Sequence, residues 1–195
     1  MDAAPFFLLR HEPLHGMMTD RLLDRLSDAH LRTRPPGLNS IAWLLWHVAR
    51  GEDLGVNAFA YGQPQVFDEG GWDKRIGAGR RDLGTSMTSD EVDAFCASVD
   101  VRAIVDYWRA VGDRTLATIR RDGARGWDEP VDPALMRRII CDTGDYGPHV
   151  DTNRVQTFYA GMTRAWAFGH LALTHSFMHF GEATVVRGML GYPGV

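Results

Sequence analysis

Apolar residues recur with a helical period in four separate stretches of this chain, and that pattern limits the fold more than any other feature of the sequence. The first stripe advances in steps of four residues: Leu14, Met18, Leu22 and Leu26. The other stretches span about 41–59, 101–121 and 163–190. Strand signals are sparse, and 154–159 is the one weak candidate. Four long amphipathic helices in one short chain predict an all-α four-helix bundle.

Capping and breaking residues mark where these helices begin and end. Asn39 or Ser40 can cap the second helix, and Asp100 can cap the third. Gly191 follows the fourth helix, as expected of a C-terminal stop. Thr88 and Glu91 have capping-box spacing and predict a short additional helix.

Two irregular segments separate the predicted helices. Residues 62–85 are rich in glycine and have no helical period, while 123–155 contain several prolines and glycines. A short helix over about 133–140 is an alternative for part of the second segment. Structureless stretches of this length are often lids or binding loops, so we expect long inter-helix loops at the mouth of a site. The length of 195 residues favours a single domain over 1–195.

Composition and charge exclude several classes of protein. The net charge is −4 and the isoelectric point is about 6.0, which argues against a nucleic-acid partner. No apolar run approaches the length of a membrane span, and no signal peptide is evident. Cys96 and Cys141 lie far apart and do not form a disulfide framework. We therefore expect a cytoplasmic protein that binds neither nucleic acid nor membrane.

The histidines are the best candidates for a functional site. His175 and His179 are four residues apart, so they share one face of a helix, and that face is otherwise mostly apolar. His47 lies in a strongly apolar helix. Each could be an imidazole satisfied by hydrogen bonds, because buried polar groups need partners. Together, three imidazoles would form a metal site of the catalytic type, with a position left for water or substrate.

Other metal and catalytic motifs do not fit this pair. Residue 176 is serine, whereas a zinc protease needs glutamate directly after the first histidine. A di-iron bundle needs two Glu-x-x-His motifs, and Glu12–His15 is the one found. The nucleophile elbow, the phosphate loop and the dinucleotide fingerprint are absent.

Neighbouring polar residues have more ordinary interpretations. His170 precedes His175 by five residues and is expected to point away from the ligand face. Glu52 turns away from His47 and is expected to pair with Arg50 or a neighbouring helix. Glu182 can accept a hydrogen bond from an imidazole or pair with Arg187. His149 is expected in a surface loop, and the loop tryptophans Trp72 and Trp127 can line a pocket mouth.

Two motifs about 130 residues apart resemble those of a known family. The run from Arg34 to Glu52, with His175-x3-His179-Phe-Gly-Glu182 and Gly188-Met-Leu-Gly191, resembles the DinB superfamily. The resemblance covers the whole chain. It implies a DinB-like four-helix bundle with a crossed connection, commonly dimeric. It also implies a divalent ion, often nickel or zinc, on His47, His175 and His179.

The same resemblance suggests a function, because the superfamily includes thiol-dependent transferases and is related to mycothiol-dependent maleylpyruvate isomerases. A cation on three neutral imidazoles lowers the pKa of a bound thiol or water. We expect a thiol S-transferase that activates mycothiol, bacillithiol or glutathione against a small electrophilic substrate. The alternatives are a non-catalytic metal-binding protein, related to stress or to protein interactions, and a metal-assisted hydrolase.

Overall fold

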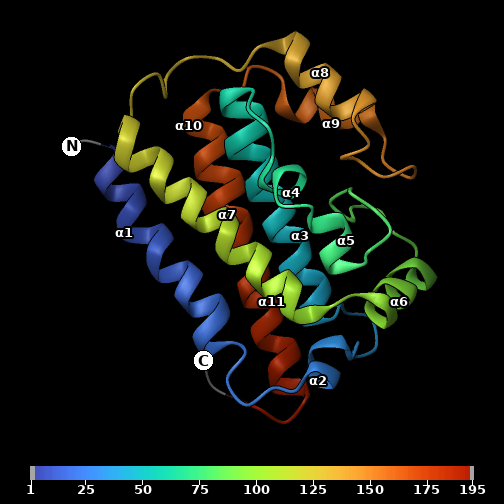
Figure 1. The fold of residues 1–195 in the computed structure, drawn as a ribbon. Helices are drawn as coiled ribbons and strands as arrows, with labels where there is room; N and C mark the ends of the chain where they lie inside the picture. Colours follow the sequence, from blue (N-terminus) through green and yellow to red (C-terminus); the bar gives the residue numbers. More distant parts are fainter. Residues whose placement is uncertain (1–2, 194–195) are drawn as a thin grey trace.

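The computed structural model describes residues 3–193, which form four long helical runs (Figure 1). The four runs are α1 (Ala3–Gly16) with η1 (Met17–Arg21), α3 (Ile41–Asp53) with η2 (Leu54–Ala60), α7 (Val101–Asp122), and α10 (Arg164–Ala167) with η3 (Phe168–Thr174) and α11 (His175–Met189). All but α7 contain a π-helical segment, labelled η. No strand is present within this range, so the all-α bundle is confirmed.

Side-chain caps fix the starts of the later runs as predicted. The Ser40 hydroxyl accepts a hydrogen bond from the Trp43 amide at 3.1 Å, and the Asp100 carboxylate accepts one from Ala103 at 3.0 Å. The second and third runs therefore begin at the predicted residues. The first run begins much earlier than its apolar stripe.

The order of the four runs around the bundle differs from their order in the chain. α3 packs against α7 and α11, whereas α1 packs against α7 and η3 (Figure 1). The first and second runs therefore lie diagonally opposite each other, and so do the third and fourth. This is the crossed connection that the resemblance implied.

The connecting segments are more helical than the sequence suggested. They carry α2 (Asp28–Arg32), α4 (Val66–Glu69), α5 (Trp72–Ile76), α6 (Ser89–Ser98), α8 (Pro133–Asp142) and α9 (Thr152–Tyr159). The weak strand expected over 154–159 was wrong, because this segment belongs to α9. The Asp151 carboxylate caps it by accepting from the amides of Asn153 and Arg154. The capping box of Thr88 and Glu91 is confirmed at the start of α6.

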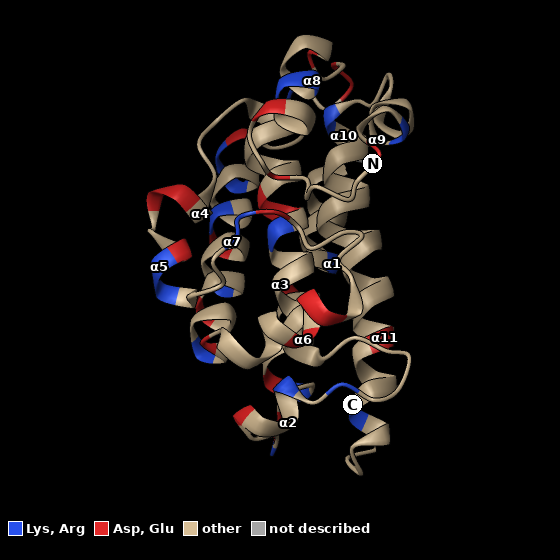
Figure 2. Ribbon diagram, turned by 90° about the vertical axis from the view of Figure 1, so that its right-hand side faces the viewer, with Lys and Arg blue, Asp and Glu red and all other residues tan. Residues whose placement is uncertain are grey.

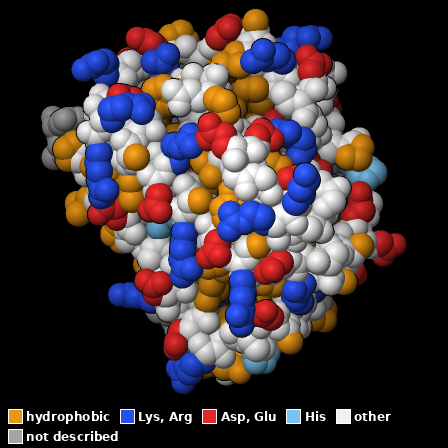
Figure 3. Space-filling view, in the orientation of Figure 1, with side chains coloured by type: hydrophobic (Ala, Val, Ile, Leu, Met, Phe, Trp, Pro, Cys, Tyr) orange, Lys and Arg blue, Asp and Glu red, His pale blue; other side chains and the backbone are white. Residues whose placement is uncertain are grey.

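The core is mainly apolar and aromatic, although several charged side chains, such as Arg50 and Glu52, are buried in it. Trp46 and Trp108 are fully buried between the runs, and Trp72 and Trp127 are also buried, so neither loop tryptophan lines a pocket mouth. Basic and acidic residues are both scattered along the ribbon in Figure 2, and their side chains intermingle over the face seen in Figure 3. Among residues 3–193, no helix combines the length and the apolar character needed to cross a bilayer.

Candidate metal centre

Three histidines from two helices that are far apart in the chain meet inside the bundle. His47 comes from α3, and His175 and His179 come from α11. The ring centroids lie 4.7 to 4.8 Å from one another, and one nitrogen from each ring falls within 4.8 Å of the others. The Nε2 atoms of His47 and His175 are 3.0 Å apart. Nitrogens on one tetrahedral ion would be roughly 3.3 Å apart, given bonds of ~2 Å, so this trio has suitable spacing for a divalent ion.

Two of the three rings are held so that Nε2 faces the common centre. His47 donates from Nδ1 to the carbonyl oxygen of Leu83 at 2.7 Å, and its ring stacks on Trp43. His179 donates from Nδ1 to the Glu182 carboxylate at 2.9 Å. Because these partner oxygens only accept, the protons belong on Nδ1 and the Nε2 lone pairs are free.

His175 is positioned by packing and by its contact with His47, because its Nε2 lies within hydrogen-bond distance of His47 Nε2. Its Nδ1 is buried without a partner among the described residues. Gly51 on α3 leaves room for the ring, since a Cβ there would lie 3.2 Å from ring atoms of His175. The absence of a side chain at Gly51 therefore lets the fourth run approach α3 at the level of the site.

Burial keeps the rings of His47 and His175 uncharged. It lowers the pKa of His47 to about 4, assisted by His179 and opposed by the Leu83 hydrogen bond. Burial lowers the pKa of His175 to about 2, with further effects from His47, His179 and His170. Both imidazoles are therefore neutral at pH 7, which is the state that binds a metal ion.

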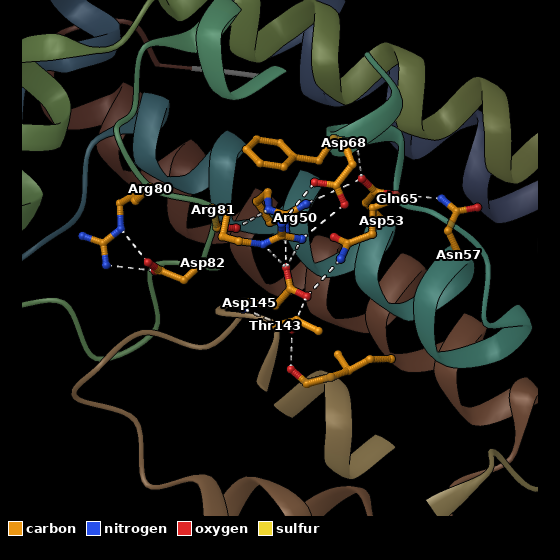
Figure 4. A network of polar contacts seen from close by, with 12 residues as sticks. Arg50, Asp53, Asn57, Gln65, Asp68, Arg80, Arg81, Asp82, Thr143 and Asp145 are labelled. Atoms are coloured by element: carbon orange, nitrogen blue, oxygen red, sulfur yellow. Dashed lines mark hydrogen bonds and ion pairs between the residues drawn. The ribbon is translucent and has the colours of Figure 1, made fainter. Parts of the chain in front are cut away.

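A buried polar network holds the loop that supplies the Leu83 carbonyl (Figure 4). Arg50 on α3 donates to the backbone oxygen of Arg81 at 2.8 Å and to the Asp145 carboxylate at 2.7 Å. The Leu83 amide in turn donates to the backbone oxygen of Asp145 at 3.0 Å. These contacts join two loops from distant parts of the chain to the helix that carries His47.

A cavity of about 650 Å³ opens onto two of the three metal-site histidines. His47 and His175 form part of its wall, together with His149, His170 and mostly apolar or aromatic side chains. The apolar and aromatic members are Trp43, Leu83, Tyr146, Val150, Val155, Phe158, Tyr159 and Leu171. The second irregular segment, predicted over 123–155, thus does reach the site, through residues between 146 and 155. His149 is half exposed and lies 3.3 Å from the Glu91 carboxylate.

The expected orientation of His170 was wrong. His170 lines the same cavity as His175, with ring centroids 6.3 Å apart, and stacks on Trp166. The segment before His175 is π-helical, and the Thr174 hydroxyl donates to the carbonyl of Gly169 five residues earlier. A π turn brings residues five apart towards the same side, whereas an α turn separates them.

Glu182 and Glu52 have definite partners. Glu182 supports His179, while Arg187 is buried and donates to the carbonyls of Leu22 and Asp24, so the alternative pair between Glu182 and Arg187 is not formed. Glu52 does turn away from His47, but it does not pair with Arg50; its partners lie mainly on α1, across the bundle from α3.

The contact of Glu52 with α1 forms a second group of potential metal ligands, which the sequence analysis missed. His11 and His15 of α1 and Glu52 of α3 offer ligand atoms within 4.8 Å of one another. The signal was present, since His11-Glu12-Pro13-Leu14-His15 matches the H-E-x-x-H pattern of zinc sites.

Comparison with known proteins agrees with this architecture. A solved structure described as a conserved protein from Enterococcus faecalis superposes with a TM-score of 0.68 at 18% identity, covering 98% of this chain and 99% of that one. At this identity the likeness supports the fold alone. No curated protein matches the chain significantly. The family model of the DinB superfamily matches residues 14–183, which is most of the sequence. The chain therefore belongs to the DinB superfamily.

Proposed function

We propose that this protein is a metal-dependent thiol S-transferase whose divalent ion, nickel or zinc, is held by His47, His175 and His179. The observation that carries the proposal is the meeting of three imidazoles, with His47 and His175 neutral, beside a largely apolar cavity. A divalent ion bound there would stabilise a thiolate at neutral pH. Such a cavity suits a small organic electrophile better than a polymer.

The reacting thiol has to come from a small molecule. Cys96 is buried beside Ser40, and burial raises the pKa of its thiol. Cys141 is exposed, and neither cysteine lines the cavity. Mycothiol, bacillithiol and glutathione are the thiols proposed as cosubstrates.

The chain's own residues provide orientation and a proton acceptor. Burial lowers the pKa of His170, so its ring is neutral at the cavity wall and can accept the thiol proton. The sulfur then forms a bond to the electrophilic carbon, and the leaving group departs with the bonding electrons. Trp43, Tyr146 and Phe158 supply apolar surface that excludes water around the reacting atoms.

A thiol panel tests this proposal. Purified protein loaded with Zn²⁺ or Ni²⁺ is mixed with each thiol and monobromobimane, and adduct fluorescence is followed. We expect at least about a tenfold rate increase over the uncatalysed reaction with one thiol, consistent with the size of nucleophile activation effects. The His175→Ala variant should lose this increase. His30→Gln, a change outside the cavity lining, should keep it.

Two other functions have distinct outcomes in the same experiment. Thiol-independent ester or amide cleavage would favour a metal-assisted hydrolase. Metal binding with no rate increase for any thiol would contradict the transferase and favour a non-catalytic metal-binding protein. The homodimer, the small-molecule substrate and the cytoplasmic location remain predictions.

A further inference from the structure

A second cluster of ligand-type side chains lies deep in the bundle, on the opposite side of α3 from the three histidines. His11 Nε2 is 2.7 Å from Glu52 Oε1, and His15 Nε2 is 3.0 Å from Glu52 Oε2. The two imidazoles are one turn apart on α1, and their ring centroids are 4.4 Å apart. The cluster therefore links two helical runs that lie diagonally opposite each other.

We propose that His11, His15 and Glu52 form a second, structural site for a divalent ion of the zinc class. Two imidazole nitrogens and one carboxylate make up a recognised zinc ligand set. Ligand atoms on a tetrahedral zinc are roughly 3.3 Å apart, given bonds of ~2 Å, so separations of 2.7 and 3.0 Å require only a small opening of the cluster.

The surrounding residues hold these ligands in place. Trp108 stacks on the His15 ring with centroids 3.8 Å apart, and Phe7 stacks on His11. Gly112 on α7 leaves space for the His15 ring, since a Cβ there would lie only 2.4 Å from its atoms. Thr115 donates to Glu52 Oε1 at 2.7 Å, in the outer-shell role that orients a ligating carboxylate.

The charge of the cluster also favours a cation. Glu52 is fully buried, and among residues 3–193 no lysine or arginine forms an ion pair with it. Both imidazole Nε2 atoms lie against carboxylate oxygens, which only accept, so each carries a proton that a bound ion would displace. A buried carboxylate is stabilised by a bound positive ion.

The position of Glu12 indicates that this site is not a protease. In the H-E-x-x-H pattern of metalloproteases, the glutamate acts as general base beside the metal. Here Glu12 is about half exposed and forms an ion pair with Arg120 on α7. His11 and Glu52 are fully buried, which leaves no room for a peptide at the cluster. A small pocket of about 210 Å³ between α1 and α7 reaches His15 and offers the ion a route inwards.

Metal stoichiometry in a variant that lacks the first site tests this proposal. The His175→Ala/His179→Ala double variant is saturated with Zn²⁺, or with Co²⁺ as a spectroscopic probe, desalted and measured by elemental analysis. We expect one ion per chain to remain, and we expect it to be lost when Glu52→Gln is added. His30→Gln is the matched control and should leave the count unchanged. Circular dichroism checks folding of each variant.

The decisive measurement is the number of ions retained per chain. The proposal requires one ion whose retention depends on Glu52 and not on His175 or His179. Absence of any ion in the double variant, or its retention after Glu52→Gln, would overturn the proposal and leave a hydrogen-bonded cluster only. Should Glu52→Gln fail to fold, Co²⁺ titration of the unaltered protein decides: two ions per chain support the second site, and a single ion contradicts it. The thiol assay is independent, because it reports on the first site.

Discussion

At the residue scale, the properties of each metal-site histidine depend on what its other ring nitrogen contacts. His47 is fixed by a backbone carbonyl and His179 by a carboxylate, whereas His175 relies on the space left by Gly51. The carboxylate is the one partner of these that a substitution can remove cleanly. Glu182 is therefore the residue on which the effect of orientation can be measured separately from ligation.

We predict that Glu182→Ala weakens metal binding about 10- to 100-fold, because His179 loses the acceptor that fixes its tautomer and ring angle. Glu182→Gln keeps an acceptor oxygen and should bind at close to the original affinity. Competition with a chromophoric chelator measures both. Equal affinities for the alanine variant and the unaltered protein would show that Glu182 does not orient His179.

At the scale of the helices, close packing between η2 and η3 sets how the second and fourth runs meet. A Cβ on Gly55 would lie 2.6 Å from Leu171 Cβ, so the two π-helical segments touch at a glycine. Gly181 lies in α11 with nothing within 4 Å of a Cβ, and it is exposed. Alanine substitutions at these two glycines therefore distinguish the destabilisation caused by crowding from the stabilisation caused by higher helix propensity.

Gly55→Ala should lower the free energy of unfolding by about 1–3 kcal/mol, because the destabilisation from overpacking is larger than the stabilisation from the higher helix propensity of alanine. Gly181→Ala should raise it by up to about 1 kcal/mol, since alanine favours a helix. Urea denaturation followed by circular dichroism measures both changes. A stabilised Gly55→Ala protein would mean that the two runs separate easily at this contact.

Arg50 connects α3 to the loops that frame the cavity, and it is fully buried (Figure 4). We predict that Arg50→Met lowers the free energy of unfolding by about 3–5 kcal/mol, because Asp53 and Asp145 lose a buried cationic partner. Arg109→Met removes an exposed pair with Asp106 and should have little effect. Urea denaturation at pH 7 compares them, and similar losses for both would contradict the structural role of Arg50.

At the scale of the whole molecule, buried neutral imidazoles make the metal-free protein sensitive to acid. The unfolded chain binds protons at its histidines near pH 6.5, while folded His47 has a pKa of about 4. Above pH 6.5 both states are neutral and His47 has no effect. Between pH 6.5 and about 4 the unfolded state binds more protons, so stability falls as pH falls.

The expected loss from His47 alone is about 1.4 kcal/mol per pH unit within that window, and His175 adds to it in the same direction. Urea denaturation in the presence of a chelator at pH 7.0, 6.0 and 5.0 measures the slope. The His47→Gln variant should show a shallower slope. A stability that stays constant from pH 7 to 5 would rule out burial of the neutral ring.

Much of the architecture follows from local sequence. The second run was predicted over 41–59 and is found over 41–60, and the third was predicted over 101–121 and is found over 101–122. Apolar period and N-caps act within one helix, so they can be read from neighbouring residues. The short helices of 62–85 lack such signals, and the α9 segment was mistaken for a strand because it is too short for its period to be decisive.

The sequence by itself determined the four helices and the placement of His175 and His179 on one face, because both depend on contacts a few residues apart. Only the tertiary structure decided that His47 meets that face, that a π turn brings His170 to the cavity, and that Glu52 reaches His11 and His15. These outcomes depend on how runs far apart in the chain pack around a shared core. No local period encodes that packing, because it is set by the shape and burial of side chains from all four runs.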